Sequence, residues 1–130
     1  DNGDLSLRET AERETFEEIG LNLSHSSCLL GELDTIELNR RQSKDILVTP
    51  FVYSLLDKDF VLHKNHEVAE IFWGPLDQMI IGTSLVSKEV KRNGTLQYFP
   101  GYTLDKQIIW GLTFRILQKL FSLISLKDTK

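Results

Sequence analysis

The chain has 130 residues, 41% of them hydrophobic and only three of them proline, which suits one globular domain, residues 1–130, with a core of its own. The net charge of -4 is unevenly spread, because residues 1–20 hold seven acids and two bases whereas residues 86–130 hold eight bases and three acids. This pattern argues against a protein that coats nucleic acid. The single cysteine, Cys28, excludes an internal disulfide and favours an intracellular, reducing location.

The first predicted element is a helix over residues 7–19. Ser6 and Glu9 have the spacing of a capping box, in which each side chain bonds to the other residue's backbone amide. Gly20 follows the last turn, and glycine tolerates the left-handed conformation that ends many helices. Both helix ends are therefore marked in the sequence.

Three segments rich in β-branched and aromatic residues are then predicted to be strands. They are residues 28–36, 45–56 and 67–73. Pro75 is placed to open a short helix, because the amide hydrogen that proline lacks would have no partner in a first helical turn. Asn93-Gly94 has the composition of a tight turn and predicts a hairpin with two extended arms.

A final helix is predicted over residues 104–124. Its apolar side chains cover about two-thirds of the circumference, so it is expected to be buried on more than one side, in the core or in a homodimer. The apolar run at residues 108–126 is interrupted by Arg115, Gln118 and Lys119. No membrane-spanning helix is therefore predicted.

Three glutamates crowd the second half of the first helix. An apolar stripe on this helix consists of Leu7, Ala11, Thr15 and Ile19. With Leu7 at zero, Glu14 lies at about 340°, Glu17 at about 280° and Glu18 at about 20°, beside that stripe. Like charges at this spacing repel, more so when partly buried, so a counter-charge is needed. Arg13 can neutralise one carboxylate, and Mg²⁺ can bind others; a solvated acidic face is the alternative from spacing alone.

The order of residue types favours the metal. Residues 13–21 follow the pattern R-E-x-x-E-E-x-G plus an apolar residue, matched by Arg13, Glu14, Glu17, Glu18, Gly20 and Leu21. This series resembles the second half of the Nudix box, with Thr15 in place of the usual bulky aliphatic residue. In the full box a glutamate stands eight residues before the arginine, where this chain has Leu5, and the first glycine would precede residue 1.

The resemblance implies an α+β protein with a Nudix-type α/β/α sandwich and a mixed sheet. Because the early strands of that fold precede the box, it also implies a truncated domain that lacks the N-terminal strands. Glu14, Glu17 and Glu18 are the implied ligands of Mg²⁺ or Mn²⁺, and Arg13 is expected to orient one of them. The implied activity is hydrolysis of the pyrophosphate bond in a nucleoside diphosphate derivative, a small-molecule substrate.

A later loop often supplies a general base in this family, and Glu67 and Glu70 are the candidates here, with solvent-facing strand residues as the alternative. On the predicted hairpin, a cationic cluster is expected to bind substrate phosphates, or else to protect a solvated edge strand. It consists of Lys88, Lys91 and Arg92. Aromatic residues at 73, 98, 99 and 102 suit either base stacking or core packing.

The substrate expected from resemblance is coenzyme A or its thioesters. EVAEIFWGPL (67–76) resembles the segment that follows the box, and IIWGLT (108–113) resembles the start of the last helix in the coenzyme A diphosphatase branch. Three alternatives stay open: a hydrolase of ADP-ribose or NADH, a Nudix-like binding module without catalysis, and an unrelated α+β protein with an acidic scaffold helix. The compartment is equally open between peroxisome, mitochondrion and cytoplasm.

Overall fold

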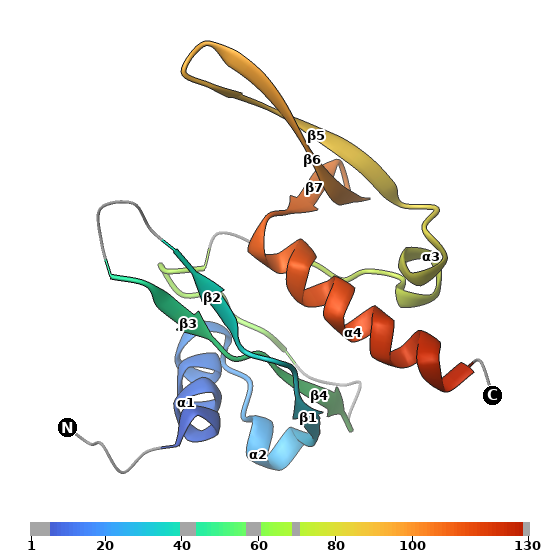
Figure 1. Cartoon of the computed structure of the whole chain (residues 1–130). Coiled ribbons are helices and arrows are strands. Elements are labelled where there is room, and N and C mark those ends of the chain that lie inside the picture. Colours follow the sequence, from blue (N-terminus) through green and yellow to red (C-terminus); the bar gives the residue numbers. More distant parts are fainter. Residues whose placement is uncertain (1–5, 40–43, 57–60, 69–70, 129–130) are drawn as a thin grey trace. The chain divides into compact units, whose positions relative to one another are not determined.

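The computed structural model describes residues 6–39, 44–56, 61–68 and 71–128. The chain divides into two compact units, Asp1–Ile71 and Phe72–Lys130, called the first and the second unit below (Figure 1). None of the helices in the described ranges combines the length and the apolar character needed to span a lipid bilayer. The mixture of helices and antiparallel strands confirms the predicted α+β class.

The first unit carries the acidic helix. Its elements are α1 (Leu7–Ile19), α2 (Leu23–Ser26), β1 (Ser27–Glu32), β2 (Ile36–Leu38), β3 (Ile46–Val48) and β4 (Phe51–Leu55). β1 pairs with β4 and β2 pairs with β3, both antiparallel. The β1–β4 register shifts between Leu29 and Gly31, which marks an irregularity in this ladder. Among the described residues of this unit, the buried apolar side chains are Leu21, Leu23, Leu33 and Ile36.

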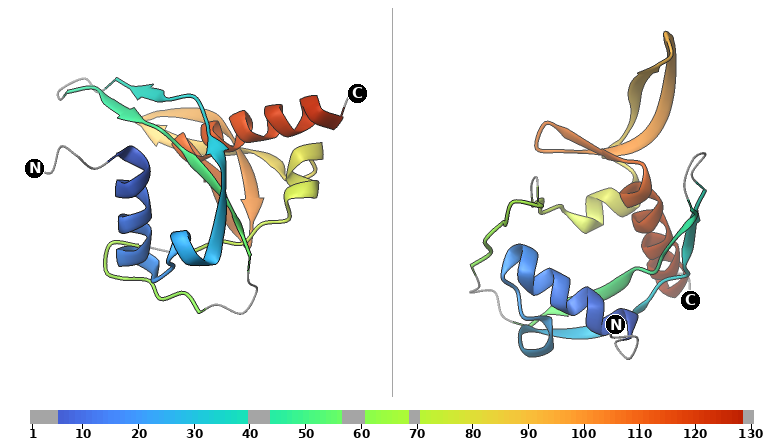
Figure 2. Two further views of the ribbon diagram at one scale, coloured as in Figure 1. Left: turned by 90° about the horizontal axis from the view of Figure 1, so that it is seen from below. Right: turned by 90° about the vertical axis from the view of Figure 1, so that its left-hand side faces the viewer.

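The second unit packs one long helix against a three-stranded antiparallel sheet. Its elements are α3 (Leu76–Ile81), β5 (Leu85–Arg92), β6 (Thr95–Leu104), β7 (Gln107–Trp110) and α4 (Leu112–Asp128). Tyr102 on β6 is 1% exposed, and its ring lies 5.1 Å from that of Phe114 and 5.7 Å from that of Phe121, both on α4. Met79 completes this core, and Gln118 bonds to the Tyr102 hydroxyl. The β5–β6 hairpin extends beyond the short β7 strand (Figure 2).

Local signals in the sequence predicted several elements correctly. Helix α1 has the predicted bounds and the predicted capping box, and Gly20 ends it at φ 78°. The hairpin turn is also confirmed, because Asn93 and Gly94 both have positive φ, as the tight turn between twisted strands requires. The first two predicted strands, residues 28–36 and 45–56, each correspond to two shorter strands: β1 and β2, and β3 and β4. Pro50, which lacks a backbone amide hydrogen, lies at the break between β3 and β4.

Two of the predicted elements were wrong. Among the described residues of 67–73, none is in a strand, because none of them has a neighbouring strand to complete a ladder. The last helix begins at Leu112 rather than 104, since residues 107–110 form β7 against β6. Asp105 and Lys106 make the turn between these strands, and Gly111, at φ 72°, separates β7 from α4.

Candidate active site on helix α1

The three glutamates predicted to bind the metal lie on α1 and differ in exposure. Glu14 and Glu17 are exposed, whereas Glu18 is half-buried. Nη1 of Arg13 lies 3.0 and 3.1 Å from the two carboxylate oxygens of Glu17, one turn along the helix. The predicted pairing of Arg13 with one glutamate is therefore present, in an exposed ion pair that contributes little stability. Both contacts direct the Glu17 carboxylate toward Arg13.

The opposite side of α1 faces the rest of the first unit, but no side chain of the helix is fully buried. Ala11, Thr15 and Ile19 are half-buried as predicted, and the Thr15 hydroxyl donates to the Ala11 carbonyl at 2.8 Å. Leu7 was wrongly assigned to the apolar stripe, because its side chain is 67% exposed in the first turn. With so little apolar burial, polar contacts must contribute to fixing the helix in place.

One of these contacts joins α1 to β4. The Tyr53 hydroxyl donates to Oε2 of Glu12 at 2.7 Å, and Nε of Arg8 donates to the same oxygen at 3.0 Å. The hydrogen bond from Tyr53, followed by that from Arg8, lowers the pKa of Glu12 below its usual range. Burial, together with the ionised Glu12, raises the pKa of Tyr53. The pair therefore stays a phenol and a carboxylate at neutral pH.

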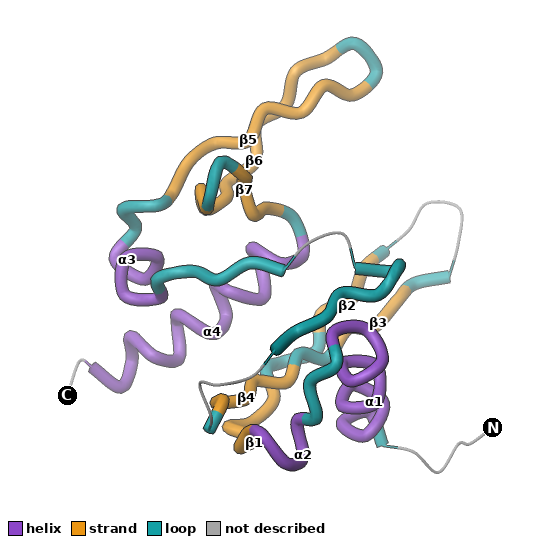
Figure 3. Tube along the Cα trace, turned by 180° about the vertical axis from the view of Figure 1, so that it is seen from behind, coloured by secondary structure: helices purple, strands orange, loops and turns teal. Residues whose placement is uncertain are grey.

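A second contact ties the C-terminal turn of α1 to the loop segment 61–68, which Figure 3 shows beside this helix. The amide of His63 donates to the Ile19 carbonyl at 2.9 Å, and the amide of Asn65 donates to the Glu18 carbonyl at 2.7 Å. The Asn65 side chain donates through Nδ2 to the Glu17 carbonyl at 3.1 Å. The roles of Asn65, Glu12 and Tyr53 were not predicted from the sequence, because the residues of each contact are distant in the chain.

The same loop carries the candidate general base. The amide of Glu67 donates to Oδ1 of Asn65 at 2.8 Å, so Glu67 sits in a turn rather than at the mouth of a strand. Its side chain is 62% exposed, and its Oε1 lies 4.0 Å from Nε2 of His66. Glu70, the other predicted base, lies outside the described residues.

The donor set suits a hard divalent cation. In the described part of the chain, no three His, Cys, Asp or Glu side chains already converge to hold a metal ion. Mg²⁺ needs only one or two protein carboxylates and keeps several waters. Exposed carboxylates at 14 and 17 with Glu18 beside them supply oxygen donors of that kind, so the residues present fit the ion.

The predicted cationic cluster of the second unit does not lie on one face of the sheet. Alternation along β5 places Lys88 and Arg92 on one face and Lys91 on the other. Lys88 pairs across the ladder with Phe99, and the Arg92 guanidinium lies 5.4 Å from the Phe99 ring centre. Phe99 in turn lies 5.5 Å from Trp110 of β7. The sheet face thus combines two cations with an aromatic pair, and we call it the Lys88–Arg92 face.

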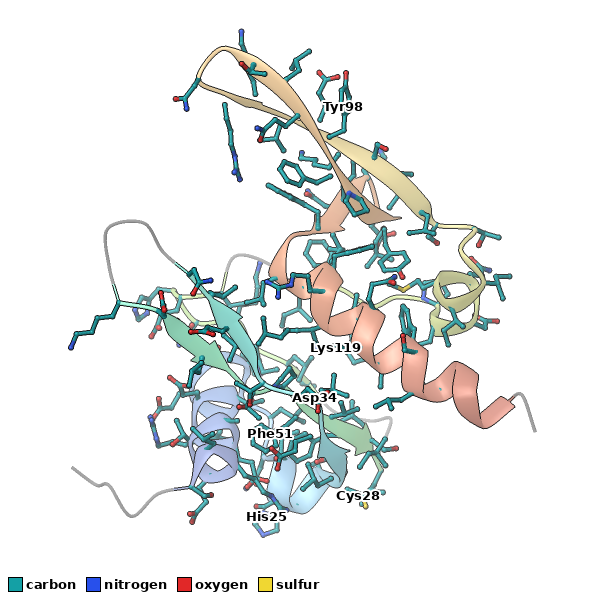
Figure 4. All side chains as sticks on the ribbon, viewed as in Figure 1. His25, Cys28, Asp34, Phe51, Tyr98 and Lys119 are labelled. Atoms are coloured by element: carbon teal, nitrogen blue, oxygen red, sulfur yellow. The ribbon has the colours of Figure 1, made fainter. Side chains whose placement is uncertain are left out.

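The remaining aromatic candidates divide by burial. Tyr102 belongs to the core, which excludes it from stacking on a base. Tyr98 is 62% exposed on the hairpin and points away from the strands (Figure 4). It lies on the sheet face opposite to Phe99, as Lys91 does. Phe99 and Trp110 are half-buried.

Comparison with known proteins shows the family of this chain. A family model described as "NUDIX domain" matches residues 1–97. The chain is 36% identical to an uncharacterized Nudix hydrolase NudL of Photorhabdus laumondii, 32% to Nudix hydrolase 3 of Caenorhabditis elegans, and 33% to an uncharacterized NudL of Yersinia enterocolitica. Each match covers 90% of this chain, which spans 60%, 54% and 57% of the three relatives, respectively.

Proposed function

Because the chain belongs to the Nudix family, we propose that it is part of an enzyme that hydrolyses the pyrophosphate bond of a nucleoside diphosphate derivative, with Mg²⁺ or Mn²⁺. The observation that carries this proposal is helix α1. It presents the R-E-x-x-E-E series as an ordered, capped helix with two of its three carboxylates exposed. Such reactions depend on charge and positioning, so a helix that supplies carboxylates and no nucleophile suits the chemistry.

Glu14, Glu17 and Glu18 would hold the divalent ion. When bound, such an ion neutralises the pyrophosphate and lowers the pKa of the attacking water. Arg13 keeps the Glu17 carboxylate oriented through its two contacts. Glu67 is the proposed general base, which takes a proton from the water as its oxygen bonds to phosphorus. The bridging P–O bond breaks in the same reaction, and the second phosphate leaves with the rest of the substrate.

Coenzyme A or one of its thioesters is the proposed substrate. Support comes from the resemblance of residues 67–76 and 108–113 to the coenzyme A diphosphatase branch, although residues 108–110 form β7 rather than a helix start. The Lys88–Arg92 face adds a physical argument. Coenzyme A carries a 3′-phosphate on its adenosine, and cations beside an aromatic pair can bind a base together with its phosphate.

This proposal can be tested because Lys88 and Arg92 lie on one face of the hairpin and Lys91 lies on the other. We expect the full-length protein to cleave coenzyme A to adenosine 3′,5′-bisphosphate and 4′-phosphopantetheine, with a higher kcat/KM than for dephospho-coenzyme A, ADP-ribose or NADH. Lys88→Ala/Arg92→Ala should remove most of the preference for the 3′-phosphate. Lys91→Ala, on the other face, is the matched control and should retain it. Equal losses in both variants would contradict the assignment of the face.

A binding module without catalysis is the second candidate, and one observation favours it. The carboxylates of the described residues do not yet converge on a metal position. A protein of this kind would bind the nucleotide and release no product. A product assay with Mg²⁺ therefore separates the two candidates, since only the enzyme yields adenosine 3′,5′-bisphosphate.

A further inference from the structure

The C-terminus of α1 is completed by residues from a distant loop. The last four carbonyls of a helix have no partner within it. In α1 each of them accepts a hydrogen bond: Phe16 from the Gly20 amide, Glu17 from the Asn65 side chain, Glu18 from the Asn65 amide, and Ile19 from the His63 amide. Asn65 alone therefore supplies two of the four donors.

The Asn65 side chain also bonds to a residue of its own loop. Its Oδ1 accepts the amide of Glu67 at 2.8 Å, while its Nδ2 donates to the Glu17 carbonyl at 3.1 Å. One short side chain thus connects the backbone of a predicted metal ligand to the backbone of the predicted base. The amide group suits this position because it offers a donor and an acceptor on one short stem.

Other residue types would break one of these bonds. Aspartate keeps the acceptor for Glu67 but has no donor for the Glu17 carbonyl, and its charge would face the negative end of the helix dipole. Alanine removes both bonds. The last turn of α1 has no basic side chain to replace them.

We propose that Asn65 is a positioning residue that sets the place of Glu67 relative to Glu17 and Glu18. The inference rests on the proposed hydrolase function, in which Glu67 acts as the base. Asn65 touches neither substrate nor metal in this role. It acts through the three glutamates whose backbones it holds, Glu17, Glu18 and Glu67.

The test compares Asn65→Ala and Asn65→Asp with the parent and with Asn39→Ala, an exposed asparagine just after β2. We expect both Asn65 variants to lower kcat by about 10- to 100-fold with KM within about threefold, as for lost supporting bonds at other sites. Asn39→Ala should leave both constants unchanged. Circular dichroism checks that each variant is folded. If Asn65→Ala unfolds, Asn65→Asp, which keeps the acceptor for the Glu67 amide, serves in its place.

Two further readouts separate positioning from general loosening. Hydrogen exchange at the Glu67 amide should accelerate in Asn65→Ala but not in Asn39→Ala. The Glu67→Gln variant keeps the backbone amide of residue 67 and removes the carboxylate that Asn65 positions. In that background, Asn65→Ala should lower kcat by less than about threefold. An equal loss in both backgrounds, or unchanged kinetics in a folded Asn65 variant, would overturn this inference alone. A parent protein that is inactive on the whole substrate panel would overturn the proposed function as well.

Discussion

Replacing Tyr53 with phenylalanine should loosen the attachment of α1 to β4 while leaving the ring in place. The substitution removes an O–H donor that lies 2.7 Å from Glu12, whose side chain is only 19% exposed. A hydrogen bond to a charged group contributes about 1.5–3 kcal/mol, and water can reach Glu12 in part, so we expect a loss of about 1 kcal/mol in the free energy of unfolding. That corresponds to a factor of about five in the unfolding equilibrium.

Urea unfolding of the parent, Tyr53→Phe, Glu12→Gln and the double variant measures this bond as a coupling energy. We expect a coupling of at least about 0.5 kcal/mol. Tyr98→Phe, at an exposed tyrosine on the hairpin, is the matched control and should stay within about 0.5 kcal/mol of the parent. If Tyr53→Phe behaves like the control and the coupling is below about 0.3 kcal/mol, the reasoning is refuted.

Two other predictions concern pH and the second unit. The pKa of Tyr53 is raised in the folded protein, so folding favours the protonated phenol. The stability that this preference contributes is fully present below the ordinary tyrosine pKa of about 10. It is lost as the pH rises through the pKa of Tyr53 in the folded protein. The parent should therefore lose stability more steeply than Tyr53→Phe above about pH 10; parallel alkaline curves would argue against the raised pKa. Gly101→Ala should destabilise the second unit by about 1–3 kcal/mol, because the new methyl carbon would lie 2.7 Å from Cγ2 of Ile108 and 2.8 Å from the Ile109 carbonyl oxygen. Thr103→Ala, an exposed position on the same strand, is its control in thermal unfolding, and equal midpoints would contradict the tight approach.

The parts of the molecule that were predictable depend on neighbours in sequence. Helix α1 was predictable because the capping box of Ser6 and Glu9 and the left-handed Gly20 act within a few residues. The hairpin was predictable for the same reason. Residues 108–110 were misassigned because an apolar, β-branched run suits a helix and a strand equally, and pairing with β6 decides the outcome.

The hydrogen bonds that hold the candidate site in place were not predictable from the sequence pattern. Tyr53 meets Glu12 across 41 residues of sequence, and the Asn65 side chain meets Glu17 across 48. Such pairs form only after the fold brings the elements together. The Asn65–Glu67 turn carries one local signal, since asparagine side chains often bond to the amide two residues ahead.

The most direct test of the central claim is hydrolysis of coenzyme A by the full-length protein and its Glu17→Gln variant, each with Mg²⁺ and with excess chelator. If α1 holds the divalent ion, the chelator should abolish product formation, and Glu17→Gln should lower kcat/KM by at least about 100-fold. The variant should remain folded, because the Arg13–Glu17 ion pair is exposed and contributes little stability. Hydrolysis that persists with chelator, and activity of Glu17→Gln within about threefold of the parent, would contradict the assignment.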